Sequence, residues 1–190
     1  DTISTGSWCY TETLEVKPPS VVLHAFIDAV SKNGQLLLNL SPMADGTIPQ
    51  DQRDCLIEFG DWLEVNGEAI YSTRPWLEFG EGPTRMERSG SHQKEFLEYT
   101  SEDIRYTRSK DGKALYVIVM GWPEKGKVSP SILNIADNGK GKIEMLGSDG
   151  ELNFKIKDGR LTISVAGKKP CDYAYAFKLT GFTTSLTAEA

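Results

Sequence analysis

The chain has 190 residues, of which 39% are hydrophobic and 25% charged, and its formal net charge is -6 at pH 7. This length suits one large domain or two small units, and the composition is typical of globular proteins. The acidic balance argues against a nucleic-acid partner, because nucleic-acid-binding proteins usually present a basic face. No apolar run approaches the ~20 residues of a membrane span, so no membrane partner is predicted.

The first 67 residues have the pattern of an α/β unit. Pro18-Pro19-Ser20 predicts a helix start with Ser20 as the N-cap, and Asn33-Gly34 predicts a left-handed helix end. An apolar run over residues 35–40 follows at once and predicts a strand buried on both faces, as in a parallel sheet. Pro49 then begins a second helix.

This α/β unit is too small to stand alone. Asn66-Gly67 predicts the end of the second helix by the same device as Asn33-Gly34. One helix–strand–helix repeat cannot cover a parallel strand on both sides. We therefore expect the unit to belong to a barrel or open sheet whose other strands lie upstream of Asp1. The chain also starts with Asp1 rather than Met, and we interpret it as a processed product or a piece of a longer protein.

The remainder of the chain has the pattern of an all-β domain. Residues 68–79 show little periodicity and are interpreted as a connector packed along the surface. Short strands separated by turns then follow, including separate strands at 131–135 and 142–146, and they predict an antiparallel β-sandwich. Asp-Gly hairpin turns are predicted at residues 110–113 and 157–160.

The predicted fold class is therefore α/β followed by all-β. We place the domain boundary after residue 79, with an α/β part at 1–79 and a β-sandwich at 80–190. The aromatic residues of the sandwich alternate along their strands, which is the period of a core face. They are Tyr106, Tyr116, Phe154, Tyr173, Tyr175 and Phe177.

The cysteines give no metal site. Cys9, Cys55 and Cys171 match no zinc spacing, and their odd number leaves at least one thiol unpaired. We predict that all three are buried small apolar residues. No cofactor or metal is predicted.

Three stretches carry a resemblance to a known family: SWCY (7–10), VSKNGQLLLNLSPMADGTIP (30–49) and GDWLEVNGEAIYSTRPW (60–76). They resemble, in order and at the right separations, the C-terminal part of the α-L-fucosidases of glycoside hydrolase family 29. The later residues resemble the C-terminal β-sandwich of that family in layout only. Cys9 and Ser41 stand where the family pattern has glycine, and Gln35 where it has asparagine.

The resemblance implies the end of a (β/α)8-like barrel and a retaining mechanism with an aspartate nucleophile and a glutamate acid/base. In the family both carboxylates precede the S-W-x-Y motif, so no catalytic residue is expected in this chain, and the chain alone is expected to be inactive. The fucose-binding histidines of the family also come from earlier strands, and His24 and His92 do not match them. We expect His24 to be packed or half-exposed.

One substrate-binding residue is carried over from the family. The aromatic residue of S-[WF]-x-Y lines the sugar pocket, and here it is Trp8. Tyr10 and Asn39 are candidate site-supporting residues. For Tyr10, packing behind the loop is the favoured alternative. For Asn39 it is a side-chain bond that ties down a loop at the carboxyl end of the strand.

Other polar and aromatic candidates are interpreted as structural. Asp45 is expected to be a turn residue, and Glu58 and Glu68 to have surface or structural roles. Trp76 is expected to pack between the domains.

The predicted function is that of the C-terminal portion of a retaining exo-α-L-fucosidase acting on terminal α-L-fucose of glycans. The alternative is a non-catalytic carbohydrate-binding or structural β-sandwich module. Expected partners are fucosylated glycans and the rest of the barrel, and homo-oligomer formation stays open. The resemblance favours a secreted, periplasmic or lysosomal location.

Overall fold

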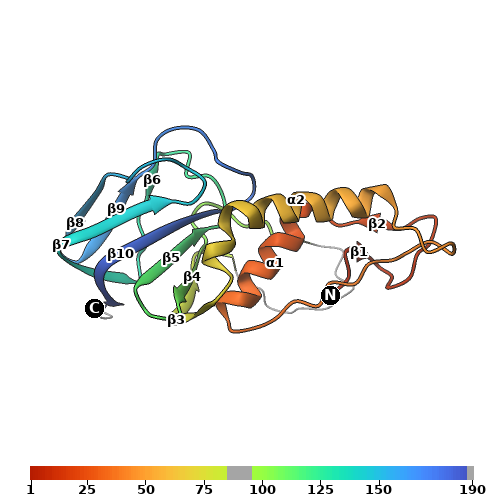
Figure 1. Ribbon diagram of the computed structural model, residues 1–190, viewed down its shortest axis with the longest axis horizontal. Coiled ribbons are helices and arrows are strands. Elements are labelled where there is room, and N and C mark those ends of the chain that lie inside the picture. Colours follow the sequence, from red (N-terminus) through yellow and green to blue (C-terminus); the bar gives the residue numbers. More distant parts are fainter. Residues whose placement is uncertain (85–95, 188–190) are drawn as a thin grey trace.

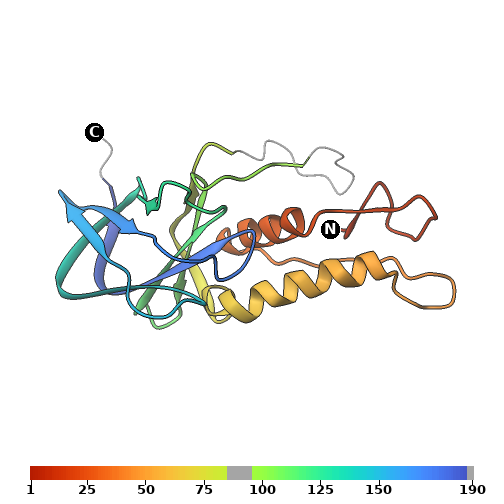
Figure 2. The same cartoon turned by 90° about the horizontal axis from the view of Figure 1, so that it is seen from above.

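A pair of helices packs on a curled antiparallel sheet (Figures 1 and 2). The computed structural model describes residues 1–84 and 96–187. The helices are α1 (Pro19–Ser31) and α2 (Gln50–Asn66), and α2 continues into the single turn η1 (Gly67–Ala69). A small hairpin of β1 (Ser4–Thr5) and β2 (Glu15–Val16) lies at the end of the helices away from the large sheet. The predicted fold class, α/β followed by all-β, is confirmed.

The helix ends follow the predictions only in part. Helix α1 begins at Pro19 with Pro18 as its N-cap, two residues before Ser20, the predicted cap. It is closed by Asn33 at a φ of 64°, as a left-handed end requires. The same end was expected for α2, but Gly67 has a φ of -57° and the prediction is wrong there. The side chain of Asn66 is instead used in hydrogen bonds. Its Nδ2 donates to Trp62 O, and its Oδ1 accepts the backbone N–H of Ala176.

The predicted buried strand at residues 35–40 is extended but not buried. It runs parallel to the first residues, with Ile3 N donating to Asn39 O at 3.0 Å. Leu37 is nevertheless 86% exposed, and Leu36 and Leu38 are half-buried. A parallel strand is buried on both faces only when it has neighbours and covering helices on both sides. Among the described residues this segment has a parallel partner at the start of the chain alone.

The large sheet has the strand order β3-β4-β5-β10-β7-β9-β6, with β8 paired to β9, and the pairings are antiparallel. Its strands are β3 (Thr73–Glu81), β4 (Ile104–Ser109), β5 (Ala114–Val119), β6 (Lys127–Val128), β7 (Leu133–Met145), β8 (Phe154–Lys157), β9 (Arg160–Ser164) and β10 (Tyr175–Leu186). Strand β3 includes most of the predicted connector, so the expected boundary after residue 79 falls inside a strand.

The curl of the sheet comes from its two longest strands. The two strands predicted at 131–135 and 142–146 are one 13-residue strand, β7, that bends instead of ending. At the bend the Asp137 carboxylate accepts the amide N–H groups of Gly139 and Gly141. The opposite strand, β10, has a bulge between Thr180 and Phe182. Such bulges bend a strand and increase its twist.

The hairpin turns were predicted correctly. Asp158 and Gly159 both have positive φ, 51° and 75°, as a two-residue hairpin turn of the primed type requires. Gly112, with φ 72°, closes the turn between β4 and β5.

Because the sheet curls, it encloses one apolar core and presents a second face to the helices. Inside the curl, side chains of β4 and β9 from distant positions in the strand order meet in one cluster. Trp76 belongs to this cluster and packs against Tyr106 with ring centroids 5.1 Å apart, so its expected role between domains is wrong. The outer face of β5 and β10 packs on α1 and α2, with Trp62 fully buried between them.

The contact between helices and sheet is also held by polar groups. Asp28 on α1 pairs with Arg105 on β4 at 2.7 Å and with Lys32 at 2.7 Å. The Asp28 and Arg105 side chains are 7% and 4% exposed. The indole N–H of Trp62 donates to Ala174 O at 2.8 Å, and Thr107 Oγ1 donates to Ala69 O at 2.6 Å.

Histidine 24 lies in the same contact, as the sequence predicted for a packed histidine. It is 7% exposed, its Nε2 donates to Tyr173 O at 3.2 Å, and its ring meets Tyr99 edge-on. Burial lowers the pKa of His24, and the charge of Arg105 adds to this effect, whereas the Tyr173 carbonyl and Asp103 oppose it.

We expect removal of one partner of the buried ion pair to destabilise the fold. The Asp28→Ala change leaves the Arg105 guanidinium buried without its carboxylate, which costs about 3–5 kcal/mol in such pairs. Urea unfolding measures the loss. Asp111→Ala is the control at an exposed site, because the Asp111 carboxylate pairs with Lys113 and accepts the Ser109 hydroxyl in a solvent-exposed turn, where such contacts add little to stability. Equal losses in the two variants would contradict the assigned role of the buried pair.

We expect His24 to make stability depend on pH. Its pKa in the folded chain is below the ordinary value of 6.5, so the unfolded chain binds a proton first. Stability from this group is complete above the unfolded pKa and is lost as pH falls towards the folded pKa, by up to about 1.4 kcal/mol per pH unit. Urea unfolding from about pH 7 to about pH 5 should show a shallower decline in His24→Gln. Parallel curves for the two proteins would refute the prediction.

Candidate functional site

The SWCY loop, residues 7–10, lies between β1 and β2 and is held by a ring of side-chain hydrogen bonds. The carbonyl of Ser7 accepts bonds from Thr2 Oγ1 at 3.4 Å and from Ser4 Oγ at 3.0 Å. Thr2 and Ser4 are fully buried. The Ser7 hydroxyl in turn bonds to the backbone of Cys9. The backbone at Ser7 is therefore held by the buried side chains of Thr2 and Ser4.

The next carbonyl, that of Trp8, is held in the same way from the other side. Asn39 Nδ2 donates to it at 2.9 Å and Ser41 Oγ at 3.1 Å. These donors belong to the extended segment that runs parallel to the first residues. Two consecutive peptide groups on either side of Trp8 thus each accept two side-chain bonds, and the backbone that carries its indole has little freedom to turn.

The residues of the loop face outward. Trp8 is 44% exposed, Tyr10 is 39% exposed, and Cys9 is exposed. The structure therefore brings Trp8 and Asn39 together, as a site at this end requires. The side-chain bond expected for Asn39 is present, and it ties down the Trp8 loop. Tyr10 is not packed behind the loop.

The cysteine prediction is wrong at Cys9. Cys55 is buried, and Cys171 is half-buried. Burial raises the pKa of both of these thiols. Cys9 is exposed in the SWCY loop and belongs to no apolar cluster of residues 1–84 and 96–187. Its φ is not positive, so the position does not need the backbone freedom of the glycine in the family pattern.

The acidic candidates hold other elements together. The Tyr173 hydroxyl donates to the Glu58 carboxylate. The Tyr116 hydroxyl donates to Glu68 at 2.8 Å, and Lys178 pairs with Glu68 at 2.6 Å. Burial alone would raise the pKa of Glu68, but these two partners lower it. Both residues have the structural roles that the sequence predicted.

Two further candidates can be placed. Asp45 is a turn residue as expected, since its carboxylate accepts the amide and hydroxyl groups of Thr47. His92 lies outside the described residues.

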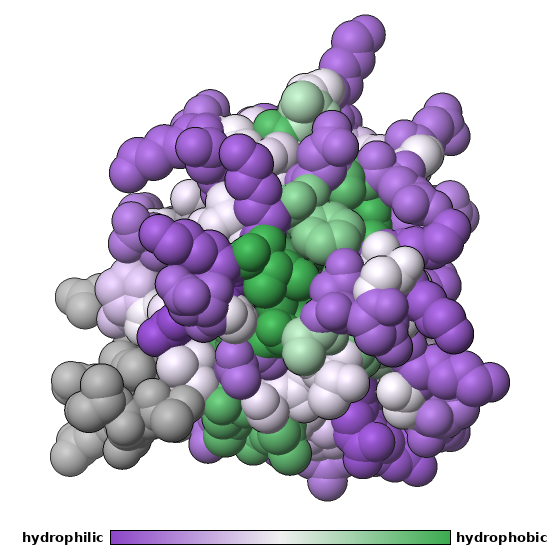
Figure 3. Space-filling view, turned by 90° about the vertical axis from the view of Figure 1, so that its left-hand side faces the viewer, coloured by the Kyte–Doolittle hydropathy of each residue, from purple (hydrophilic) through white to green (hydrophobic). Residues whose placement is uncertain are grey.

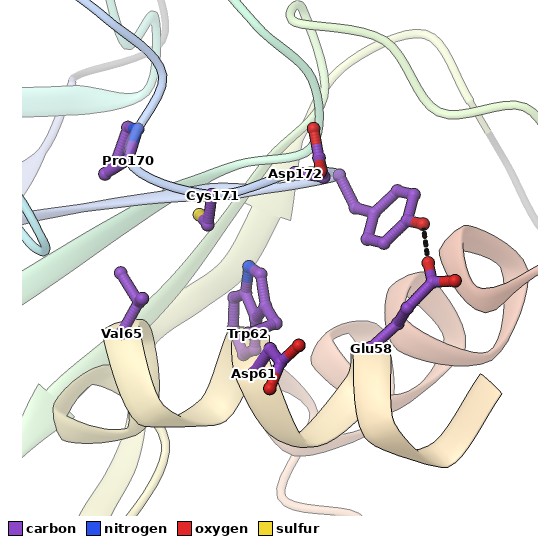
Figure 4. A pocket seen from close by; sticks show the side chains of 8 residues that line it. Glu58, Asp61, Trp62, Val65, Pro170, Cys171 and Asp172 are labelled. Atoms are coloured by element: carbon purple, nitrogen blue, oxygen red, sulfur yellow. Dashed lines mark hydrogen bonds between the residues drawn. The ribbon is translucent and has the colours of Figure 1, made fainter. Parts of the chain in front are cut away.

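A pocket of about 170 Å³ lies away from the SWCY loop, between α2 and the segment that leads into β10 (Figure 4). Trp62 and Cys171 line it, and Glu58, Asp61 and Asp172 give it an acidic rim. Figure 4 shows Glu58 turned towards the hydroxyl of Tyr173 rather than into the pocket. Its residues belong to the helix–sheet contact, and we assign it no chemistry.

Two residues at the base of the loop were missed by sequence reasoning. Gln52 is fully buried, and its Oε1 accepts the amide N–H of Ser41 at 2.9 Å. Its Nε2 donates to Ser41 O at 3.0 Å. The sequence does contain a hint for Gln52, because it lies three residues before Cys55 on the apolar side of a helix, where a polar residue is unusual. The hint for Ser41 is that it replaces the glycine of the family pattern.

Within residues 1–84 and 96–187, no group of His, Cys, Asp or Glu side chains could hold a metal ion. In the same ranges, no helix has the length and apolarity needed to cross a membrane.

Two family models match successive parts of the chain. Residues 1–68 match the model described as α-L-fucosidase, and residues 96–180 match the one described as α-L-fucosidase C-terminal domain. Tissue α-L-fucosidase of Homo sapiens is 31% identical over 186 residues, which are 92% of this chain and 35% of that protein. Plasma α-L-fucosidase of Rattus norvegicus is 28% identical over 190 residues, or 96% of this chain and 38% of that protein.

Solved structures agree with these matches. The crystal structure of Thermotoga maritima α-fucosidase has a TM-score of 0.72 and 26% identity, and the match covers 94% of this chain and 38% of that one. Its complex with fucose gives a TM-score of 0.71 at 26% identity, with 95% and 38% covered. The chain spans little more than a third of the length of the relatives it matches. It belongs to the α-L-fucosidases of glycoside hydrolase family 29 and corresponds to their C-terminal part.

Proposed function

We propose that this chain is the C-terminal portion of a retaining exo-α-L-fucosidase that removes terminal α-L-fucose from glycans, and that it places Trp8 in the sugar pocket. The observation that carries the proposal is the SWCY loop. Its backbone is held at two successive carbonyls, while the indole of Trp8 remains 44% exposed. A large aromatic side chain held in place and left accessible is suited to binding a ligand, because little freedom is lost on contact.

The chemistry of the sugar fits an indole. Fucose is a deoxysugar with a methyl group and an apolar edge of C–H bonds. An indole covers such a surface with its ring face, and its N–H can still find a polar partner. Trp8 would therefore select for the apolar side of the sugar, and the reacting groups would act at the anomeric carbon.

The carboxylates that cleave the bond are proposed to lie upstream of Asp1. Retaining enzymes need two carboxyl groups about 5–5.5 Å apart at the bond that is cleaved. Glu58 and Glu68 do not meet this need, because they bond to tyrosines at the helix–sheet contact. We therefore propose that the 190-residue chain alone does not hydrolyse fucosides.

Exposed apolar residues support a larger assembly. Leu37 is 86% exposed and Ile57 on α2 is 56% exposed. Leu37 lies on the segment that pairs with the first residues, and its exposed side chain is suited to contact with further barrel strands. We accordingly propose the rest of the barrel as a partner. The similarity to α-L-fucosidases supports fucosylated glycans as the other partner, and we propose a secreted, periplasmic or lysosomal location from the family resemblance alone. Homo-oligomer formation is compatible with these proposals.

The alternative is a sandwich that binds carbohydrate or has a purely structural role. Figure 3 shows apolar side chains gathered among hydrophilic ones on the end of the molecule formed by the curled sheet. In the described part of residues 80–190, however, no aromatic side chain is exposed. Two half-buried ones, Phe154 and Phe182, pack edge-to-face on each other with centroids 5.3 Å apart. The exposed Trp8 therefore favours the enzymatic proposal.

We expect Trp8→Ala in the full-length protein to lower kcat/KM for an aryl α-L-fucoside by roughly 10- to 200-fold, as for the loss of apolar contacts in a specificity pocket. Steady-state kinetics measure the change. Tyr71→Ala is the matched control, because Tyr71 is an aromatic residue 61% exposed at the far end of α2. A Trp8→Ala enzyme with wild-type kcat/KM would remove Trp8 from the pocket, and glycan binding without hydrolysis by the unaltered protein would favour the alternative.

A further inference from the structure

The support of the SWCY loop has a second layer inside the molecule. Ser41 and Gln52 are both fully buried, and they bond to each other twice across the space between the extended segment and α2. The side-chain amide of Gln52 satisfies both backbone groups of Ser41, as a neighbouring strand would. This leaves the Ser41 hydroxyl available to reach the carbonyl of Trp8 at 3.1 Å.

From these contacts we propose that Ser41 and Gln52 are positioning residues that connect α2 to Trp8. Gln52 fixes the backbone of Ser41, and Ser41 fixes the peptide group between Trp8 and Cys9. This proposal rests on the proposed function for its effect on the sugar pocket. The contacts themselves do not depend on that function.

The energetics favour a stiff connection. A buried amide that loses a hydrogen-bond partner bears the full cost of its desolvation, so Gln52 has a strong preference for this one arrangement. Water cannot replace the hydrogen bonds of Ser41 either, because this residue is 0% exposed. Asn39 provides the second bond to Trp8 O but is only partly buried, so water can replace it more readily.

The departures from the family pattern add a second observation. Cys9 and Ser41 both stand where the pattern has glycine, and they lie on either side of one hydrogen bond, because Trp8 O belongs to the peptide group that leads into Cys9. A glycine at position 41 has no hydroxyl and cannot donate this bond. The hydrogen bond from Ser41 Oγ to Trp8 O is thus specific to this chain and is not part of the family pattern.

The test uses the full-length protein and takes Cys9 as a built-in reporter. Cys9 is exposed beside Trp8, whereas Cys55 on α2 is buried. Alkylation by iodoacetamide, followed at each cysteine by mass spectrometry, reports loop order at Cys9 and unfolding of α2 at Cys55. In Ser41→Ala we expect Cys9 to react about 3- to 10-fold faster, the effect of losing one hydrogen bond, with Cys55 unchanged.

Steady-state kinetics form the second readout. A loop that moves weakens sugar binding in the ground state and the transition state alike, so KM for an aryl α-L-fucoside should rise about 3- to 10-fold while kcat stays within about 2-fold. A purely structural loss would not produce this division between KM and kcat.

Matched variants separate positioning from general destabilisation. Ser31→Ala removes an equally buried hydroxyl that donates to Asp28 O, far from the loop, and should leave Cys9 reactivity and KM at wild-type values. Gln52→Leu should act like Ser41→Ala, whereas Gln50→Leu, at an exposed position on the same helix, should not. If Ser41→Ala fails to fold, Ser41→Gly, the residue of the family pattern, takes its place.

The outcomes are distinct. If Ser41→Ala and Gln52→Leu match their controls in both readouts, the positioning role is refuted. If Cys9 reacts faster but the unaltered full-length protein has no fucosidase activity, the positioning role stands and the proposed function fails.

Discussion

The buried pair of Asp28 and Arg105 is the constraint on which the arrangement of this molecule depends. It joins the first helix to the second strand of the curled sheet at a point closed to water, and a charge buried there is stable only with its partner in place. Arg105 also donates to the carbonyls of Glu81 and Ile104, so its position on the sheet is fixed. The ion pair consequently fixes the position of Asp28, and with it helix α1, against β4.

Helix α2 connects the sheet to the end of the molecule that bears the SWCY loop. Near its C-terminus Trp62 is buried against the sheet, and near its N-terminus Gln52 is buried beneath the SWCY loop. About 15 Å of helix separates the two side chains, and a helix transmits position over that length with little bending. The sheet, although distant from Trp8, therefore helps to decide where Trp8 lies.

The sequence predicted the local elements well and the contacts between them poorly. Helices, Asp-Gly turns and most strands follow from periodicity and from residues that fix backbone angles, which are local properties. The single strand β7 was missed because its bend depends on Asp137 and on a bulge in β10, a distant partner. The burial expected for Leu37 failed because burial depends on neighbouring strands, and its own sequence does not supply them.

The same division holds for the candidate site. Trp8 and Asn39 came from a motif and from the end of a strand, and the structure brings them together. Gln52 could not be found in that way, because its role depends on its distance from a backbone group eleven residues away. Cys9 was misplaced because composition favours buried cysteines, while the loop that carries it turns outward.

The proposed function and the positioning roles of Ser41 and Gln52 both require that a fixed Trp8 forms a wall of the fucose pocket. A crystal structure of the full-length protein with bound fucose tests it most directly, through the distance between the indole of Trp8 and the sugar. We expect carbon–carbon contacts of about 4 Å between the indole and the sugar, with the carbonyls of Ser7 and Trp8 accepting the same side-chain hydrogen bonds as in the present structure. Fucose bound elsewhere, with the indole of Trp8 in solvent, would contradict it.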